Sequence, residues 1–182
     1  MSPPLSTTIK IDDSGMASPC QVLLSPNTDS RPANSDIDMI VIHNISLPPN
    51  QFGGPGIIAL FTNQLDAKEH PYYETISHLK VSSHFLIRRQ GELIQFVSCN
   101  QRAWHAGVSH WQGRERCNDF SIGIELEGSD DCAFNEVQYL TLQALIDALQ
   151  NRYPIKHIVG HSEIAPGRKT DPGPFFDWQR IK

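Results

Sequence analysis

Apolar residues fall into short blocks along most of this chain, and these blocks predict strands. Met39 to Ile42 is a continuous apolar run, typical of a strand buried on both faces. His157 to Gly160 is a second short strand of this kind. Phe120 to Leu126 alternates apolar and polar residues, which predicts a half-buried strand with Glu125 on its polar face. At least three strands are therefore expected to build a common sheet.

Helical spacing occurs in two segments. Gly56 to Leu65 places apolar residues at helical intervals, after a turn-rich NQFGGP loop. Val137 to Tyr153 is the longest helical pattern, and Asn135 with Gln138 three residues later forms a capping-box signature before it. The apolar stripe of this helix is expected to comprise Leu140, Ala144, Leu145, Ala148 and Leu149. The tail FFDWQRIK predicts a short terminal helix.

The order of these elements indicates an α/β or α+β fold. Val81 to Ser98 predicts two strands joined by a turn at Arg89 to Glu92. Residues 1–35 are rich in Ser, Pro and Asp without periodicity, which predicts an irregular N-terminal arm or surface cover of unassigned helix or strand content. The pattern becomes regular from residue 36, so residues 36–182 are predicted to form one domain, a sheet covered by helices.

Size and charge narrow the class of protein. The chain has 182 residues, 39% of them hydrophobic, which is enough for one domain with a real core. Its formal net charge is −5, with a sequence pI of about 5.9. Binding to a nucleic-acid backbone requires an excess of Lys and Arg on one face, so nucleic acid is not an expected partner. Nothing in the pattern predicts an oligomeric state.

Cysteine spacing and the N-terminal residues predict a location. Cys20, Cys99, Cys117 and Cys132 form no C-x-x-C pair, a pattern typical of reduced thiols rather than of a disulfide framework. The first residues lack the basic and apolar regions of a secretory signal, and no apolar run is long enough to cross a membrane. We expect a cytoplasmic protein that does not insert into membranes.

Two histidines and an aspartate stand at positions that favour a metal site. A histidine is more often a surface or packed residue than a ligand, and this chain has eight. His43 and His161, however, each follow a predicted buried strand directly, where side chains are held rigidly and face a cleft. Asp171 lies ten residues beyond His161 in a proline-rich loop. Two imidazoles and one carboxylate leave a fourth position open, as in catalytic zinc sites.

Most of the chain also carries a family resemblance. The segments that carry it are VIHNISLPP, GGPGI, SSHFLIRRQGELIQFV, RAWHAGVSHWQGRERCNDFSIGIELEG and GHSEIAPGRKTDPGPFFDW. They resemble the AmpD family of 1,6-anhydro-N-acetylmuramyl-L-alanine amidases, within the larger group of zinc amidases and peptidoglycan recognition proteins. The resemblance covers roughly residues 36 to 182. It implies a central mixed β-sheet flanked by helices, a zinc site in an open groove, and His43, His161 and Asp171 as its ligands.

The resemblance also implies a reaction, the hydrolysis of the amide between the lactyl group of N-acetylmuramic acid and L-Ala of the stem peptide, in muropeptide recycling. Zinc polarises such a carbonyl, but a side chain must still move protons. The resemblance implies that Glu125 does so and that Lys169 stabilises the developing oxyanion. From position alone, Glu125 is equally well an edge carboxylate in water, and Lys169 a surface lysine.

Residues for an anhydro-muropeptide substrate are assigned mainly by the same resemblance. Trp104 would pack against the sugar, although a core position is an equal alternative for it. His105 would contact the substrate or a zinc-bound water and is not counted as a ligand. Asn44, which follows His43, would hydrogen-bond the sugar or peptide.

Three further positions are candidates for substrate contacts. Arg116 would pair with a stem carboxylate, because a guanidinium binds carboxylates in a bidentate manner. Ala165 would offer its backbone to the same stem. Lys80 stands where the family has an arginine for the anhydro sugar, and lysine keeps the charge but loses the two-pronged geometry.

Two other functions remain open at this point. A peptidoglycan-binding module of the same fold without catalysis is one, although such modules usually lack a ligand or a catalytic partner. A phage-type amidase acting on intact peptidoglycan is the other.

Overall fold

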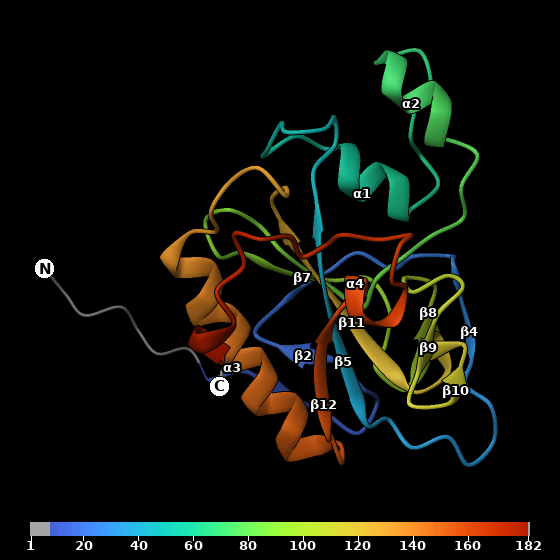
Figure 1. Cartoon of the computed structure of the whole chain (residues 1–182), viewed down its shortest axis with the longest axis vertical. Coiled ribbons are helices and arrows are strands. Elements are labelled where there is room, and N and C mark those ends of the chain that lie inside the picture. Colours follow the sequence, from blue (N-terminus) through green and yellow to red (C-terminus); the bar gives the residue numbers. More distant parts are fainter. Residues whose placement is uncertain (1–7, 182) are drawn as a thin grey trace, which may run out of the picture.

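A six-stranded mixed sheet forms the centre of the molecule in this computed structural model, which describes residues 8–181. Its strands, in spatial order, are β12 (His157–Gly160), β5 (Met39–Ile45), β11 (Ser121–Glu127), β6 (Phe85–Ile87), β7 (Leu93–Gln95) and β3 (Gln21–Val22). The first four run parallel, whereas β7 is antiparallel to β6 and parallel to β3. The predicted mixed sheet with flanking helices is confirmed (Figure 1).

Shorter elements surround this sheet. Paired antiparallel strands are β1 (Lys10–Ile11) with β2 (Ala17–Ser18), β4 (Thr28–Ser30) with β8 (Gln101–Ala103), and β9 (His110–Trp111) with β10 (Arg114–Glu115). The helices are α1 (Gly56–Phe61), α2 (Pro71–Ile76), α3 (Glu136–Arg152) and α4 (His161–Ile164), with 3-10 turns at Cys117–Asp119 and Trp178–Ile181. No helix within residues 8–181 is long and apolar enough to cross a membrane.

Residues 8–35 are more regular than the sequence predicted. They carry β1 to β4, and β3 forms one edge of the main sheet. The side chain of Arg31 is half-buried and donates hydrogen bonds to the carbonyls of Cys99, Asn118, Asp119 and Ser121. Strands of two or three residues leave no readable periodicity, which is why the sequence left their strand content unassigned. The part of the predicted arm at residues 1–7 lies outside the described residues.

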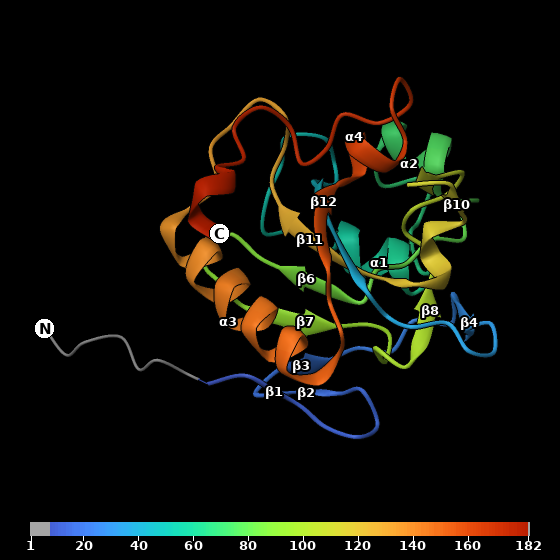
Figure 2. The same cartoon turned by 60° about the horizontal axis from the view of Figure 1, so that its bottom comes forward.

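Helix α3 covers one face of the sheet (Figures 1 and 2). Leu142, Leu145, Ile146 and Leu149 of this helix are buried against apolar residues of β5 and β11. The capping interaction predicted at its start is present, since the Asn135 N–H donates to Gln138 Oε1 at 3.0 Å. The predicted stripe was wrong at one position: Leu140 is 55% exposed, because the buried face is turned toward Leu142 and Ile146.

Strand β11 shows the expected alternation but not the expected exposure. Ile122, Ile124 and Leu126 point into the core under α3. The opposite side chains, including Ser121 and Glu125, are buried as well. The prediction of a half-buried strand was therefore wrong, because residues of the N-terminal segment and of the loop around His105 cover the polar face.

The remaining predicted elements are present but shorter. The hairpin at Val81 to Ser98 contains β6 and β7, and its turn has the Arg88 N–H donating to the Glu92 carbonyl at 2.9 Å. Helix α1 ends at Phe61 instead of Leu65. Figure 1 shows α1 and α2 beyond the end of the sheet at which β5 ends. The four cysteines are free thiols, as expected.

Candidate metal centre and active site

Adjacent parallel strands bring the two candidate histidine ligands together. Gly160 of β12 pairs with Ile42 of β5, so the next residues, His161 and His43, lie side by side. Their Nδ1 atoms are 3.0 Å apart. Asp171 approaches from the loop after α4, with Oδ2 at 3.0 Å from His43 Nδ1 and 3.1 Å from His161 Nδ1. The three ligand atoms therefore converge on one point, as a metal site requires.

The donor set fits a cation. His161 Nε2 lies 3.0 Å from the carbonyl oxygen of Ala106, which only accepts, so Nε2 carries the proton and Nδ1 of the neutral ring presents a lone pair. The Asp171 carboxylate also presents lone pairs toward the same point. Lone pairs that face each other without a shared proton repel, and a cation between them removes the repulsion. Two imidazole nitrogens and one carboxylate oxygen are a donor set of the kind that holds catalytic zinc.

Burial controls the protonation of this group of residues. It lowers the pKa of His43 to about 4, which keeps the ring neutral and able to act as a ligand. Burial alone would raise the pKa of Asp171, but the close contacts with the His161 and His43 rings outweigh it, so the pKa of Asp171 lies below its usual range. At neutral pH these two residues are thus in the forms that bind a metal.

Glu125 extends from β11 beside the three convergent side chains. Its Oε1 lies 4.0 Å from His43 Nδ1, and its Oε2 is buried without a hydrogen-bond partner among the described residues. Burial and the neighbouring charge of Asp171 raise its pKa well above the usual value, whereas Lys169 opposes the rise. A carboxyl group with a raised pKa next to a metal site is suited to exchanging protons.

A pocket of about 370 Å³ opens above these groups. We call His43, Glu125, His161 and Asp171 the polar floor. Apolar side chains from α1, α2 and the following segment also line the pocket, and we call them the apolar wall: Leu60, Phe61, Tyr72, Ile76 and Leu79. Sequence reasoning missed the part of the wall that belongs to α2. A signal existed, because His70 before Pro71 is a helix start with proline in its first turn, and His70 Nδ1 accepts from the Tyr72 N–H.

Four residues predicted to act on the substrate line this pocket: Asn44, Trp104, His105 and Lys169. Asn44 uses its Nδ2 group to bond Asp130 Oδ1 at 2.7 Å and the Pro172 carbonyl at 3.0 Å. Both amide hydrogens are therefore occupied, and the Oδ1 acceptor is the polar atom left for a ligand. Trp104 is half-buried and lines the pocket, as the predicted contact with the sugar requires.

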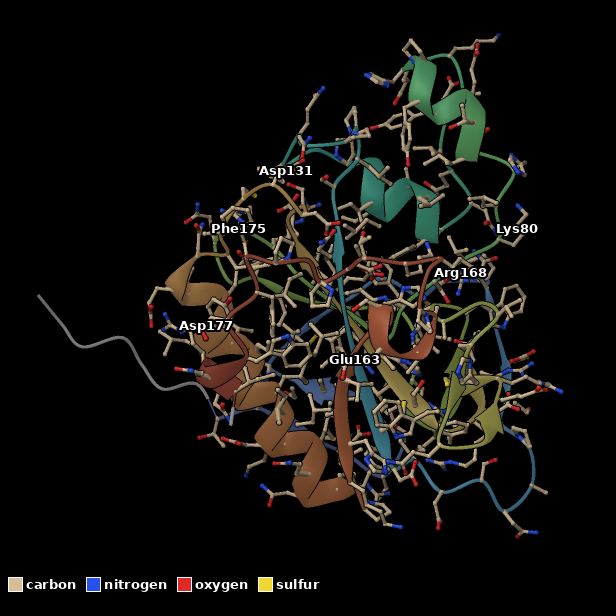
Figure 3. All side chains as sticks on the ribbon, in the orientation of Figure 1. Lys80, Asp131, Glu163, Arg168, Phe175 and Asp177 are labelled. Atoms are coloured by element: carbon tan, nitrogen blue, oxygen red, sulfur yellow. The ribbon has the colours of Figure 1, made fainter. Side chains whose placement is uncertain are left out.

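The three remaining candidates lie outside the lining of the pocket. Lys80 is exposed between two lining residues, and Figure 3 places it at the periphery, on the segment after α2. Arg116 is exposed on the loop after β10, with Nε 3.4 Å from Asp119 Oδ2. The backbone of Ala165 is used internally, because its N–H donates to the His161 carbonyl and its own carbonyl accepts from Arg168 and Lys169.

Comparison with known proteins agrees with this arrangement. Residues 33–174 match the Amidase_2 family, described as N-acetylmuramoyl-L-alanine amidase. The 1,6-anhydro-N-acetylmuramyl-L-alanine amidase AmpD of Citrobacter freundii is 55% identical over 172 residues, covering 93% of this chain and 92% of the relative. AmpD of Escherichia coli K12 is 57% identical over 160 residues, covering 87% of each chain.

Solved structures extend the match to three dimensions. A crystal structure of selenomethionine-substituted AmpD superposes with a TM-score of 0.91 at 56% identity, covering 93% of this chain and 96% of the other. The amidase AmiD from E. coli, in complex with the substrate anhydro-N-acetylmuramic acid-L-Ala-D-γ-Glu-L-Lys, gives a TM-score of 0.59 at 30% identity, with 96% of this chain and 64% of the other covered. The sequence match, the fold and the convergent His-His-Asp group together show that the chain is an amidase of the N-acetylmuramoyl-L-alanine amidase family, on the branch that contains AmpD.

Proposed function

We propose that this amidase is zinc-dependent and cleaves the bond between the lactyl group of 1,6-anhydro-N-acetylmuramic acid and L-Ala of the stem peptide. The observation that carries the proposal is the polar floor: two imidazole nitrogens and a carboxylate oxygen converge within 4.8 Å of one another, beside a buried carboxyl group. His43, His161 and Asp171 are the proposed ligands. The names of the relatives and the substrate in the AmiD complex support the choice of an anhydro-muropeptide.

Zinc held by these ligands supplies Lewis-acid polarisation of the amide carbonyl and acidification of water. Glu125 is the proposed proton carrier. Its unpartnered Oε2 faces no competing donor among the described residues, so it can accept a proton from attacking water. The raised pKa then favours keeping that proton until the leaving amine nitrogen of L-Ala takes it. A carboxyl with a normal pKa would hold the proton less well at neutral pH.

Lys169 is the proposed electrostatic partner. It is exposed but lines the pocket, and its charge acts on both Glu125 and His43. An ammonium group on this side of the floor would stabilise negative charge that develops on the carbonyl oxygen. It would also keep part of the Glu125 population ionised and so able to act as a base.

Substrate recognition is assigned to the rest of the pocket. Asn44 offers an acceptor oxygen for an N–H of the substrate, and Trp104 offers an aromatic face beside the apolar wall. Lys80 and Arg116 can take part only as outer contacts to the charged ends of a long stem peptide, because they lie outside the pocket. We propose a cytoplasmic role in muropeptide recycling, since the anhydro sugar appears in the names of relatives that this chain matches over most of their length.

A mass-spectrometric assay tests the proposal. Purified protein is stripped with a chelator, reloaded with zinc, and given an anhydro-muramyl tripeptide. We expect release of the free tripeptide only with zinc, and much slower release from intact peptidoglycan. Equal turnover of intact peptidoglycan would favour the phage-type reading. Cleavage that persists in metal-free protein would contradict the zinc assignment.

A further inference from the structure

His105 lines the pocket, but its ring also contacts two protein side chains, and a role in substrate binding does not explain these contacts. Its ring lies edge-on to the ring of His43, with centroids 5.0 Å apart. Its Nδ1 is 2.9 Å from His43 Nε2, and its Nε2 is 3.2 Å from Ser121 Oγ. Both ring nitrogens therefore have partners within the protein.

The hydrogen bonds that link Ser121, His105 and His43 determine which nitrogen of each ring carries a proton. Ser121 Oγ lies 2.6 Å from the Cys117 carbonyl oxygen, which has no hydrogen of its own, so the hydroxyl proton must point there. Ser121 Oγ then has only acceptor capacity left for His105, and His105 Nε2 carries the proton. Nδ1 of the neutral His105 ring is consequently an acceptor, and His43 Nε2–H donates to it. His43 is left with a bare Nδ1, the atom that faces His161 and Asp171.

Ala106, the next residue of the same loop, fixes the tautomer of His161 in a similar way. The Ala106 carbonyl accepts from His161 Nε2, which leaves His161 Nδ1 bare. Asn118 Oδ1 fixes this loop by accepting from the N–H groups of both His105 and Ala106, at 3.1 and 2.8 Å. Arg168 ties the loop to the segment that carries Asp171, with Nη2 2.7 Å from the Ala106 carbonyl.

Strand β11 leaves room for the His105 ring. A Cβ added at Gly123 would lie 2.5 Å from His105 Cγ and 2.8 Å from its Nδ1. Glycine inside a strand is unfavourable unless another group approaches closely, which is the case here. The position of the ring against His43 is therefore built into the sheet.

We infer that His105, oriented by Ser121, is a positioning residue that holds His43 in the tautomer with Nδ1 free to bind a metal. This inference rests on the proposed function for one point, which is that the metal bound by His43 is zinc. Outer groups that receive the second N–H of a histidine ligand commonly fix both its tautomer and its orientation. His105 thus acts through His43 and is not itself a ligand.

The test uses His105→Phe, which keeps a ring but removes the acceptor, and His105→Gln, whose side-chain carbonyl restores one. Zinc affinity is measured by competition with a chromophoric chelator. We expect His105→Phe to weaken zinc binding by about 10- to 100-fold, and His105→Gln to recover most of the loss. His110→Phe is the matched control, because His110 is exposed on β9 and does not line the pocket. A zinc affinity within about twofold of wild type in His105→Phe would overturn the inference.

A second readout separates positioning from folding. Long-range ¹H–¹⁵N spectra of the metal-free protein report which nitrogen of His43 is protonated, and we expect Nε2 in wild type and a mixture in His105→Phe. Ser121→Ala, which removes only the partner of His105 Nε2, should shift the same signals in the same direction. If wild type carries the proton on His43 Nδ1, the inference fails even when zinc binds. If wild type binds no zinc but its His43 is Nε2-protonated, the proposed function fails while the tautomer assignment stands.

Discussion

The polar floor and the apolar wall line the same pocket, yet they are built differently. The floor residues His43, His161 and Glu125 are 2%, 3% and 7% exposed and sit in or next to strands of the central sheet. The wall is carried by the six-residue helices α1 and α2 and by the segment after α2, all outside the sheet. Its Leu60 and Phe61 are as buried as the floor residues, at 6% and 2% exposed, whereas its Tyr72 and Leu79 are 40% and 39% exposed. Groups that bind a metal and move protons must be placed to a fraction of an ångström, so they profit from a rigid scaffold. Groups that contact a substrate through apolar surface tolerate a looser support.

This difference leads to a division of roles that mutations can separate. Changes in the floor should abolish metal binding or the chemical step. Changes in the wall should weaken substrate binding and leave zinc content and the chemical step largely intact.

Removing a floor ligand should have the largest effect. His161→Ala deletes one of the three convergent donors, so we expect zinc affinity to fall by more than about 100-fold, with loss of amide cleavage. Elemental analysis after gel filtration gives the zinc content, and the mass-spectrometric assay gives the activity. His78→Ala, at an exposed histidine, should change neither. Stoichiometric zinc in His161→Ala would remove this residue from the ligand set.

Glu125→Gln should separate metal binding from chemistry. The amide keeps the shape of the side chain but cannot carry the proton, so kcat should fall by about 100-fold or more while zinc stays bound. Stability should not fall, because burial already disfavours the carboxylate form of Glu125. Kinetics on the zinc-loaded variant and a thermal melt check both points. Glu115→Gln, at an exposed carboxylate on β10, is the control. Near-normal kcat in Glu125→Gln would exclude this residue as the proton carrier.

A change in the wall should have the opposite signature. Ile76→Ser lowers the apolar surface on the pocket side of α2, so KM should rise by about 5- to 30-fold, with kcat changed less than about twofold. Zinc content should equal that of wild type. Leu24→Ala, at an exposed leucine away from the pocket, controls for loss of surface hydrophobicity. A fall in kcat comparable to that of Glu125→Gln would mean that floor and wall are not independent.

The same contrast explains what the sequence could and could not predict. Floor residues follow strands with strong apolar patterns, and parallel strands end at one edge, so His43 and His161 were found from position. The direction of Glu125 was also right, but its burial was not, because its neighbours His43, Lys169 and Asp171 are far from it in the sequence. Long-range coverage of this kind leaves no local signal. Short strands such as β3 and the six-residue helix α2 are below the length at which periodicity can be recognised.

The family resemblance predicted substrate-contacting residues that local sequence patterns could not predict. Its predictions were least informative for residues at the edge of the pocket. Trp104, Asn44 and Lys169 do line the pocket. Ala165 does not offer a free backbone group, because a four-residue helix and the turn after it use both its N–H and its carbonyl. A family match assigns a position along the chain, whereas the availability of a backbone atom depends on the local turn.

Lys80 provides the most sensitive test of where the wall ends. Its neighbours Leu79 and Val81 line the pocket, but its own side chain is exposed outside the lining. We expect Lys80→Ala to raise KM by less than about twofold, since an exposed ion pair contributes little in water. Lys80→Arg, which places there the guanidinium that the family resemblance implies, should then also have little effect. Kinetics with an anhydro-muramyl tripeptide check both variants. A KM lowered several-fold by Lys80→Arg would mean that the segment after α2 moves toward the sugar when substrate binds, and the apolar wall would then have to be extended to include residue 80.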